Sequence, residues 1–571
     1  MRSLVTLRVL VWSRELRRMV ARVTPRAEEV KLLPEMALPL NSGIYLPLIQ
    51  CSECHTTGWL TRMGKTQGVV TRDLDQIYQG WFSRSPESLR LYPKEGVGAT
   101  LGQASEAKLC TICGTPNPND NRDECLNCHS GELIPVWSIG EIKSTQRDGV
   151  QYNQHLQRCP SCGARDRLIL LGARTTTLGA QVVEQSWQTP FNDDKKLIAF
   201  SDSVQDAAHR AGFFGARTYS ANVRKAVFRH ARHHETQNFN LLQLLTSLQN
   251  AHRAEGSPLQ MQQESFVAEF IGPNMEWQKE WLGLLERGAL EQPSQLIERV
   301  GKRLDWQAFG ELTFLSRRGR SLERQGLLLA APNPELVEQV AQRMIEPLRE
   351  KLGLEMEVST AFRWLWGFLD YLRQRGGVLH PEMQGYARSG SLFSLLSRPK
   401  NLWLPNMGTH SFHPVMLSLG RHRYQDSLQN RQGVSWYQRW MERHLTLSNA
   451  DQIESAYLLA IEQLEQVRVL TRIISERDGE MVLIRPESLL IWNDPVQLLS
   501  DQGQYWLNVP NQLRERLLGM PCLDGDASYQ LVRSRSEAQE QRLLRSELGR
   551  IYAAEHTGLL ERKPRDDLEN R

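Results

Sequence analysis

The sequence lacks any run of about 18 apolar residues, the length that a membrane-spanning helix needs. The apolar stretch at residues 4–12 is interrupted by Arg8, is followed by several arginines and has no small-residue cleavage site behind it. That pattern is typical of an amphipathic helix or strand and not of a signal peptide. We therefore expect a cytoplasmic protein with no membrane partner.

A strong net charge is lacking as well. Lys and Arg number 69 and Asp and Glu 65, a formal charge of +4 that is too small over 571 residues to indicate a nucleic-acid binder by itself. Internal repeats and low-complexity tracts are also missing. The hydrophobic content of 40% and charged content of 23% are ordinary for a globular protein. This length accommodates two to four domains, each with its own core.

The motifs of an ATPase are not found. No Asp-Glu-Ala-Asp or Asp-Glu-Ala-His box occurs. The tripeptide Gly64-Lys65-Thr66 resembles the end of a phosphate-binding loop, but Trp59 stands where that loop needs a glycine, and Gly58 is one place too far away. Hydrolysis of ATP requires a phosphate cradle, a magnesium carboxylate and charge stabilisation together. We expect no catalytic residue and no ATP hydrolysis by this chain alone.

Nine cysteines are present, and eight of them form four Cys-x-x-Cys pairs: Cys51/Cys54, Cys110/Cys113, Cys125/Cys128 and Cys159/Cys162. Such a turn lets two thiolates reach one zinc ion at about 2.3 Å. In a reducing compartment, metal ligation is favoured over disulfides. Gly114 and Gly163 directly follow the second cysteine of their pairs, where a positive φ closes the turn. The remaining Cys522 is predicted to be a buried thiol.

The spacing predicts how the pairs combine. Only eleven residues separate Cys113 from Cys125. The first zinc site is therefore predicted to be Cys110, Cys113, Cys125 and Cys128, which leaves Cys51, Cys54, Cys159 and Cys162 for a second site. Sequential pairing of the four turns is the alternative, and His55 or His129 could replace a cysteine. Because four thiolates leave no coordination position for water, both zinc ions should be structural.

Changes in composition and hydrophobic period along the sequence predict several regions. One helix should follow the Asn333-Pro334 cap. Around residues 453–484 a helical period gives way to two strand-like stretches about Asp478-Gly479. A helix followed by a hairpin resembles a winged-helix module, and a helix and hairpin packed on the body fit equally well. The regions are a basic lead-in at 1–40, a zinc-binding module at 41–172, a mainly helical region at 225–445, the winged-helix element at 446–500 and a connecting segment at 501–539.

Two further segments carry polar residues at the ends of predicted strands. At 196–210 a short apolar strand is followed by Ser201 and Asp202, which can cap a helix that contains Gln205. Taken alone, this is one strand–helix unit of an α/β domain. At 551–560 another strand ends in a small polar turn with His556, Thr557 and Gly558.

Together these two segments resemble the second motor lobe of superfamily 2 helicases: its opening strand and helix, and its His-Thr-Gly element. The chain is most similar to the very large bacterial DEAD/DEAH-type helicases of anti-phage defence islands, such as the helicase subunit of the Druantia system. Further similar stretches are residues 12–18, 46–51, 58–59 and 403–406. The similarity extends over most of residues 1–571.

The resemblance implies a multidomain α/β plus α fold, with a Cys₄ zinc-ribbon module, an incomplete RecA-like lobe at 173–224 and 540–571, and a large helical insertion. It implies double-stranded nucleic acid, DNA or RNA, as the substrate and partner, and ATP as fuel. It places six residues near a bound strand: Ser201, Asp202, Gln205, His556, Thr557 and Gly558. Because Walker A, Walker B and the arginine finger are not found, we expect a gene fragment or split subunit that acts with protein chains supplying the missing lobes. The alternative is a non-enzymatic zinc-ribbon interaction scaffold.

Overall fold

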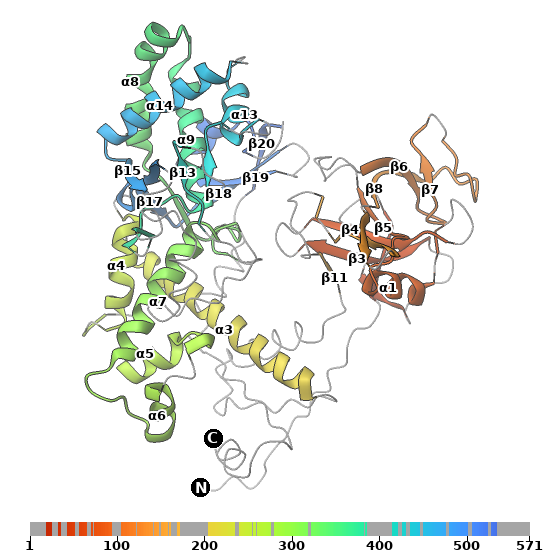
Figure 1. Ribbon diagram of the computed structural model, residues 1–571, viewed down its shortest axis with the longest axis horizontal. Helices are drawn as coiled ribbons and strands as arrows, with labels where there is room; N and C mark the ends of the chain where they lie inside the picture. The colour runs from red at the N-terminus through yellow and green to blue at the C-terminus, as the bar shows by residue number, and fades with distance from the viewer. Residues whose placement is uncertain are drawn as a thin grey trace. The chain divides into compact units, whose positions relative to one another are not determined.

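Two units, Met1–Val183 and Glu184–Arg571, make up the computed structural model of the chain (Figure 1). Each unit has its own hydrophobic core. The structure describes residues 19–24, 32–35, 43–51, 56–64, 70–71, 73–93, 104–120, 123–140, 142–147, 150–157, 159–160, 168–171, 204–234, 239–253, 255–257, 260–275, 279–317, 321–381, 383–384, 414–420, 425–429, 434–445, 449–475, 479–500, 505–523 and 527–533.

The first unit is built on an antiparallel nine-stranded sheet of order β2-β1-β3-β4-β5-β8-β6-β7, with β11 paired to β3. Two of these strands, β1 and β2, come from the stretch expected to be a basic lead-in. Strand β1 pairs with β3 and β2 pairs with β1, so both strands belong to the sheet. The strands are β1 (Met19–Arg22), β2 (Leu32–Pro34), β3 (Tyr45–Cys51), β4 (Thr57–Arg62), β5 (Ser88–Pro93), β6 (Ala104–Cys110), β7 (Pro116–Pro118), β8 (Leu133–Ile139) and β11 (Leu168–Leu170).

Helix α1 (Leu74–Phe82) packs against β4 and β5 of this sheet. It begins at Asp73, whose side chain accepts a hydrogen bond of 2.9 Å from the amide of Asp75 and so satisfies a donor of the first turn. The apolar face of α1 buries Ile77 and Trp81 in the core of the unit. The helix therefore covers part of the sheet through the 3.6-residue spacing of its apolar side chains.

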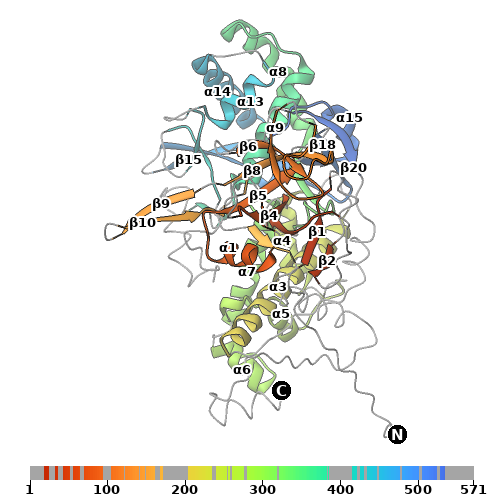
Figure 2. The same ribbon diagram turned by 90° about the vertical axis from the view of Figure 1, so that its right-hand side faces the viewer.

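A separate two-stranded ribbon completes the first unit. Strand β9 (Ile142–Arg147) pairs with β10 (Val150–His155) in an antiparallel register that joins Ile142 to His155 and Arg147 to Val150. Neither strand is hydrogen-bonded into the large sheet among the described residues. Figure 2 shows the ribbon extending away from the other strands of the unit.

The second unit is mainly helical (Figure 1). Helix α8 begins where the sequence predicts it, because Asn333 caps the helix and Pro334 occupies its first turn. The α-helices are α3 (Val204–Arg232), α4 (Leu241–Ala251), α5 (Gln263–Phe270), α6 (Lys279–Arg287), α7 (Gln295–Leu312), α8 (Pro334–Leu352), α9 (Val358–Arg375), α13 (Trp436–Glu442), α14 (Ala450–Gln466) and α15 (Arg514–Leu517), with 3₁₀ turns η3 (Pro273–Met275), η4 (Pro486–Ser488) and η5 (Asn511–Leu513).

Three small sheets connect these helices. Their orders are β12-β17, β14-β13-β16-β15 and β19-β18-β20. Strands β19 and β20 and helix α15 come from the stretch expected to be a connecting segment. The strands are β12 (Leu329–Pro332), β13 (Leu417–Ser418), β14 (Asp426–Ser427), β15 (Leu470–Ser475), β16 (Gly479–Ile484), β17 (Leu489–Trp492), β18 (Pro495–Ser500), β19 (Trp506–Pro510) and β20 (Tyr529–Arg533).

The helix and hairpin predicted around 453–484 are α14, β15 and β16. Strand β16 also pairs with β13, and the three elements contribute residues to the core of the second unit. Helix α14 packs on α8. This arrangement is the one expected of a helix and hairpin packed on the body, and the winged-helix interpretation remains a prediction.

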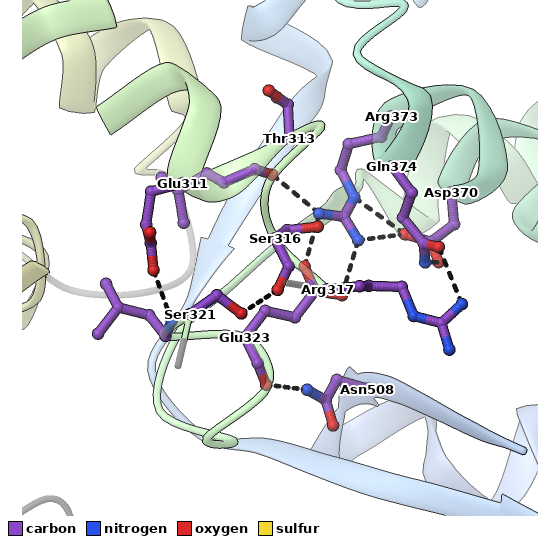
Figure 3. Close-up of polar contacts among 12 residues, drawn as sticks. Glu311, Thr313, Ser316, Arg317, Ser321, Glu323, Asp370, Arg373, Gln374 and Asn508 are labelled. Carbon is purple, nitrogen blue, oxygen red and sulfur yellow. Dashed lines mark hydrogen bonds and ion pairs between the residues drawn. The ribbon is translucent and has the colours of Figure 1, made fainter. Parts of the chain in front are cut away.

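A buried ionic cluster lies in the second unit (Figure 3). Arg373 of α9 donates from Nη2 to Asp370 Oδ1 at 2.7 Å and from Nη1 to Glu323 Oε2 at 2.7 Å. The same guanidinium donates to the carbonyl of Leu312 at the end of α7 at 2.8 Å. The side chains of all three charged residues are no more than 2% exposed. One arginine thus joins α7, α9 and the loop that contains Glu323.

Candidate metal centre

Four cysteines of the first unit come together at one end of the β6–β8 pair. Cys110 is the last residue of β6, Cys113 lies in the following turn, and Cys125 and Cys128 lie in a turn before β8. Their sulfur atoms all lie within 4.8 Å of one another. The Cys113–Cys125 and Cys110–Cys128 sulfurs are 3.4 Å and 3.5 Å apart. In a tetrahedral site with metal–sulfur bonds of about 2.3 Å, the sulfurs are about 3.8 Å apart. The four thiols are thus within the range that a metal ion needs.

The two cysteine turns share the same backbone pattern. In the first, the amide of Gly114 donates to Cys110 O at 2.8 Å, and the amide of Cys110 donates to Thr115 O at 3.0 Å. In the second, the amides of His129 and Cys125 donate to Cys125 O and Ser130 O, both at 2.9 Å. The residue after each second cysteine has a positive φ, which is 75° at Gly114 and 56° at His129. Two equivalent loops therefore present their sulfurs to one point.

The first turn requires its glycine for a second reason. A β-carbon on Gly114 would lie 2.0 Å from Cδ1 of Ile44, and Ile44 is itself fixed by an amide hydrogen bond of 2.8 Å to Thr111 O. The second turn is exposed at His129, so a side chain fits there. His129 therefore serves as a turn residue, and four thiols already provide the ligands that it was expected to be able to replace.

Polar groups lie around the sulfurs. The amide of Asn127 donates to Cys125 Sγ at 3.4 Å, and Asn117 Nδ2 lies 3.6 Å from the same sulfur. Burial opposes ionisation of Cys113, yet hydrogen bonds from the hydroxyl and amide of Thr115 lower its pKa to about 6. At Cys110 burial prevails and raises the pKa to about 12. A bound cation would compensate that burial by ionising the thiol outright.

The site is enclosed on most sides. Cys110, Cys113 and Cys125 are buried, Cys128 is exposed, and the three buried sulfur residues pack with Leu133. Four thiolates complete a tetrahedron and leave no position for a water molecule. The donor set therefore suits a structural metal ion and not a hydrolytic one. Among the described residues, these four cysteines form the group of three or more side chains whose ligand atoms lie close enough to share a metal ion.

The predicted second site is described only in part. Cys51, the last residue of β3, and Cys159 are both fully buried in the core of the first unit. Strand β11 pairs with β3 at this end, with Leu168 opposite Cys51. Cys54, His55 and Cys162 lie outside the described residues. The second zinc site thus remains a prediction. Cys522 is fully buried in the second unit, as expected.

The six residues expected near nucleic acid are not brought together by the described part of the chain. Gln205 lies in the first turn of α3. Ser201, Asp202, His556, Thr557 and Gly558 lie outside the described residues. The RecA-like lobe to which they were assigned therefore remains a prediction.

Gly58 and Trp59, which precede the tripeptide at Gly64, lie within β4 between β3 and β5. A β-carbon on Gly58 would lie 2.7 Å from Leu91 O, so the residue permits the close approach of β5. Met63 then pairs with Val70 in an isolated bridge, which closes the loop. Lys65 and Thr66 lie outside the described residues. The residues before this loop thus belong to an antiparallel sheet and do not form a phosphate cradle.

Sequence reasoning missed two polar residues beside the sulfurs, Thr115 and Asn117, and considered His129 only as a ligand and not as a turn residue. The signal that could reveal the first is its position two residues after Cys113, which matches Ser130 after Cys128. No protein-family model, curated protein or solved structure matches the chain. Within the part of the chain that the structure describes, the helices are too short or too polar to cross a membrane. The site is a cluster of four cysteines on two turns that could hold a metal ion.

Proposed function

We propose that Cys110, Cys113, Cys125 and Cys128 hold a structural zinc ion that stabilises the first unit. The observation that carries this proposal is the convergence of four sulfurs within 4.8 Å on two equivalent turns. Tetrahedral four-sulfur sites select zinc or iron, and a closed zinc site contributes folding free energy directly. We extend the proposal to a second zinc ion held by Cys51, Cys54, Cys159 and Cys162.

Elemental analysis of the chain purified without chelators tests this. We expect about two zinc ions per chain, and about one after Cys113→Ser, because three thiolates bind the ion far more weakly. Cys522→Ser is the matched control, since this thiol lies outside the site and its loss should leave the zinc content unchanged. Less than one zinc per chain in the wild type would contradict the proposal. Iron, recognised by its visible thiolate absorption, would show that the bound metal is iron and not zinc.

We further propose that the chain is a helicase-like protein that binds DNA or RNA weakly, acts with partner chains that supply the ATPase motifs, and belongs to phage defence. The support is the resemblance of residues 196–210 and 551–560 to a helicase lobe, together with a zinc module at 41–172. Contacts to phosphates release counterions, so the affinity should fall steeply with salt. Fluorescence anisotropy with single- and double-stranded probes at low salt, repeated at increasing salt, measures this.

The alternative function is a zinc-ribbon interaction scaffold, and one surface favours it. Strand β15 is an edge of its sheet, and Ile474 on it is 76% exposed. A groove of about 440 Å³ in the same unit is lined by Leu352, Leu458 and Arg472 among others. An exposed apolar edge is a site for association with another chain. Under this alternative no nucleic-acid probe binds, and Ile474→Lys reduces the self-association seen by analytical ultracentrifugation.

A further inference from the structure

The four cysteines of the metal site differ in their access to solvent. Cys110, Cys113 and Cys125 are buried, whereas Cys128 is exposed. A peroxide molecule in solution therefore reaches one sulfur of the cluster more readily than the other three. Oxidation of a cysteine follows its thiolate character and its exposure, and a zinc ion holds its cysteine ligands as thiolates. In a zinc-loaded site, Cys128 thus meets both conditions.

Two pairs of sulfurs join one cysteine turn to the other. Sγ of Cys128 lies 3.5 Å from Sγ of Cys110, and Sγ of Cys113 lies 3.4 Å from Sγ of Cys125. An oxidised Cys128 therefore has the Cys110 sulfur at contact distance. These two sulfurs would need to approach by only about 1.5 Å to reach the length of an S–S bond. A disulfide between them would connect the end of β6 to the turn before β8.

Hydrogen bonds that do not involve a metal hold the two turns beside each other. The amide and the hydroxyl of Thr111 donate to the carbonyl oxygen and Oε2 of Glu132, both at 2.9 Å. The amide of Leu126 donates to Asn117 Oδ1 at 2.8 Å, and Nδ2 of Asn117 donates to Lys108 O at 3.1 Å. Strands β6 and β8 also pair directly behind the site. The sulfurs would therefore stay within reach of one another without a metal ion.

We propose that Cys128 and Cys110 form a reversible disulfide on reaction with a peroxide, which releases the metal ion while the two turns remain joined. The Cys128 thiolate attacks a peroxide oxygen, the O–O bond breaks, and the sulfur becomes a sulfenic acid. The Cys110 thiolate then attacks this sulfur, the S–O bond breaks, and the S–S bond forms. The two sulfurs lose two electrons in total. Hydrogen peroxide takes up these electrons and two protons and becomes two water molecules.

The disulfide removes half of the ligands from the site. Only Cys113 and Cys125 remain, and two thiolates bind zinc too weakly to retain it. Thiol reductants reverse the step by thiol–disulfide exchange, which returns both ligands. This inference rests on the proposed structural zinc site and adds a modification that controls its occupancy.

The test treats the full-length, zinc-loaded chain with hydrogen peroxide. A chromogenic zinc chelator follows metal release, and we expect about one zinc ion per chain to be released, because one Cys₄ site loses its ligands. Mass spectrometry of non-reduced tryptic peptides, after alkylation of the free thiols, identifies the disulfide. Trypsin cleaves after Arg122, between the two turns, so a Cys110–Cys128 disulfide joins two peptides and a disulfide within one turn does not. Dithiothreitol and added zinc should restore the starting metal content.

Cys128→His tests the exposed position, because histidine ligates zinc but forms neither a sulfenic acid nor a disulfide. This variant should retain the wild-type zinc content and release metal in peroxide about tenfold more slowly. Cys522→Ser is the matched control, since it removes a buried thiol of the second unit and should release zinc as the wild type does. Should Cys128→His bind no zinc, the peptide map of the wild type decides alone.

The outcomes separate this inference from the zinc site itself. A wild-type chain that binds zinc and keeps it in peroxide overturns the inference while the zinc site stands. Release without a disulfide between Cys110 and Cys128 also overturns it, as does equal release from the wild type and zinc-loaded Cys128→His. A wild-type chain with less than one zinc ion contradicts the proposed site, and the redox inference falls with it.

Discussion

Gly114 and His129 occupy the same position in two successive cysteine turns, and both have a positive φ. Their surroundings differ, since Gly114 faces the side chain of Ile44 and His129 is exposed. Both residues thus adopt the same backbone conformation. The position next to Ile44 has no room for a side chain and is a glycine, whereas the exposed position has room and is a histidine.

This difference predicts opposite effects of substitution. Gly114→Ala should destabilise the first unit by about 2 kcal/mol or more, because the new methyl group meets Ile44 and the left-handed conformation costs about 1–2 kcal/mol. His129→Gly should be neutral or stabilise the unit by up to about 1 kcal/mol, because it removes that conformational cost. Urea unfolding of the zinc-loaded variants measures both. Equal destabilisation by the two substitutions would contradict the equivalence of the turns.

The buried cluster around Arg373 predicts a large loss of stability in the second unit. Arg373→Met should cost about 3–5 kcal/mol, because Asp370 and Glu323 would remain buried without their cation. Arg375→Met is the matched control on the same helix. Arg375 pairs with Asp426 but its side chain is 40% exposed, so its loss should cost only about 0–1 kcal/mol. Thermal unfolding distinguishes them, and similar melting temperatures would show that the buried cluster contributes little.

Two buried histidines predict sensitivity to acid. Burial, together with nearby histidines, lowers the pKa of His230 to about 4, and burial lowers that of His444 to about 4. In the unfolded chain both groups titrate near 6.5. Their contribution to the free energy of unfolding is therefore complete above pH 6.5. It is lost as the pH falls toward 4, because the unfolded state binds protons that the native state does not.

Urea unfolding at several values between pH 7 and pH 4.5 measures this loss, which should be on the order of a few kcal/mol for the two groups together. His444→Gln should make the pH dependence shallower, whatever its effect on the stability at pH 7. An unchanged slope in this variant would mean that His444 is not a source of the acid sensitivity.

The loop at Gly64 predicts a negative result. Because Gly58 and Trp59 belong to β4, their amides hold a sheet together and cannot also cradle phosphates. We expect no ATP turnover above buffer background in the purified chain, with or without nucleic acid. A coupled phosphate-release assay measures this, with Lys65→Ala as the comparison. Turnover that disappears in Lys65→Ala would refute this interpretation of the loop.

Local signals predicted much of what the structure shows. Spacing alone grouped Cys110 with Cys113, Cys125 and Cys128, because few residues separate the two turns. The cap at Asn333 and the first-turn Pro334 predicted the start of α8, since both act within one helical turn. The helix and hairpin at α14, β15 and β16 followed from a change of hydrophobic period.

Interactions between distant segments were not predictable in the same way. The segment that contains β1 and β2 was predicted to be a basic lead-in, because its place in the sheet depends on the pairing of β1 with β3, which lies further along the chain. The contact between Gly114 and Ile44 joins residues seventy positions apart, so only a three-dimensional structure reveals it. The ion pair of Arg373 with Glu323 is likewise long-range, and in sequence these charges are indistinguishable from exposed ones.

The position of the cysteine cluster limits how β6 and β8 can pair. Cys110 ends β6 opposite Leu133, the first residue of β8, and the turn that contains Cys125 and Cys128 leads directly into that strand. A slip of one residue would turn every side chain of β8 to the opposite face of the sheet. It would also shift one cysteine turn relative to the other by about 3.4 Å, too far for four sulfurs to share an ion. A bound metal would therefore favour this register of β6 and β8 over the registers shifted by one residue.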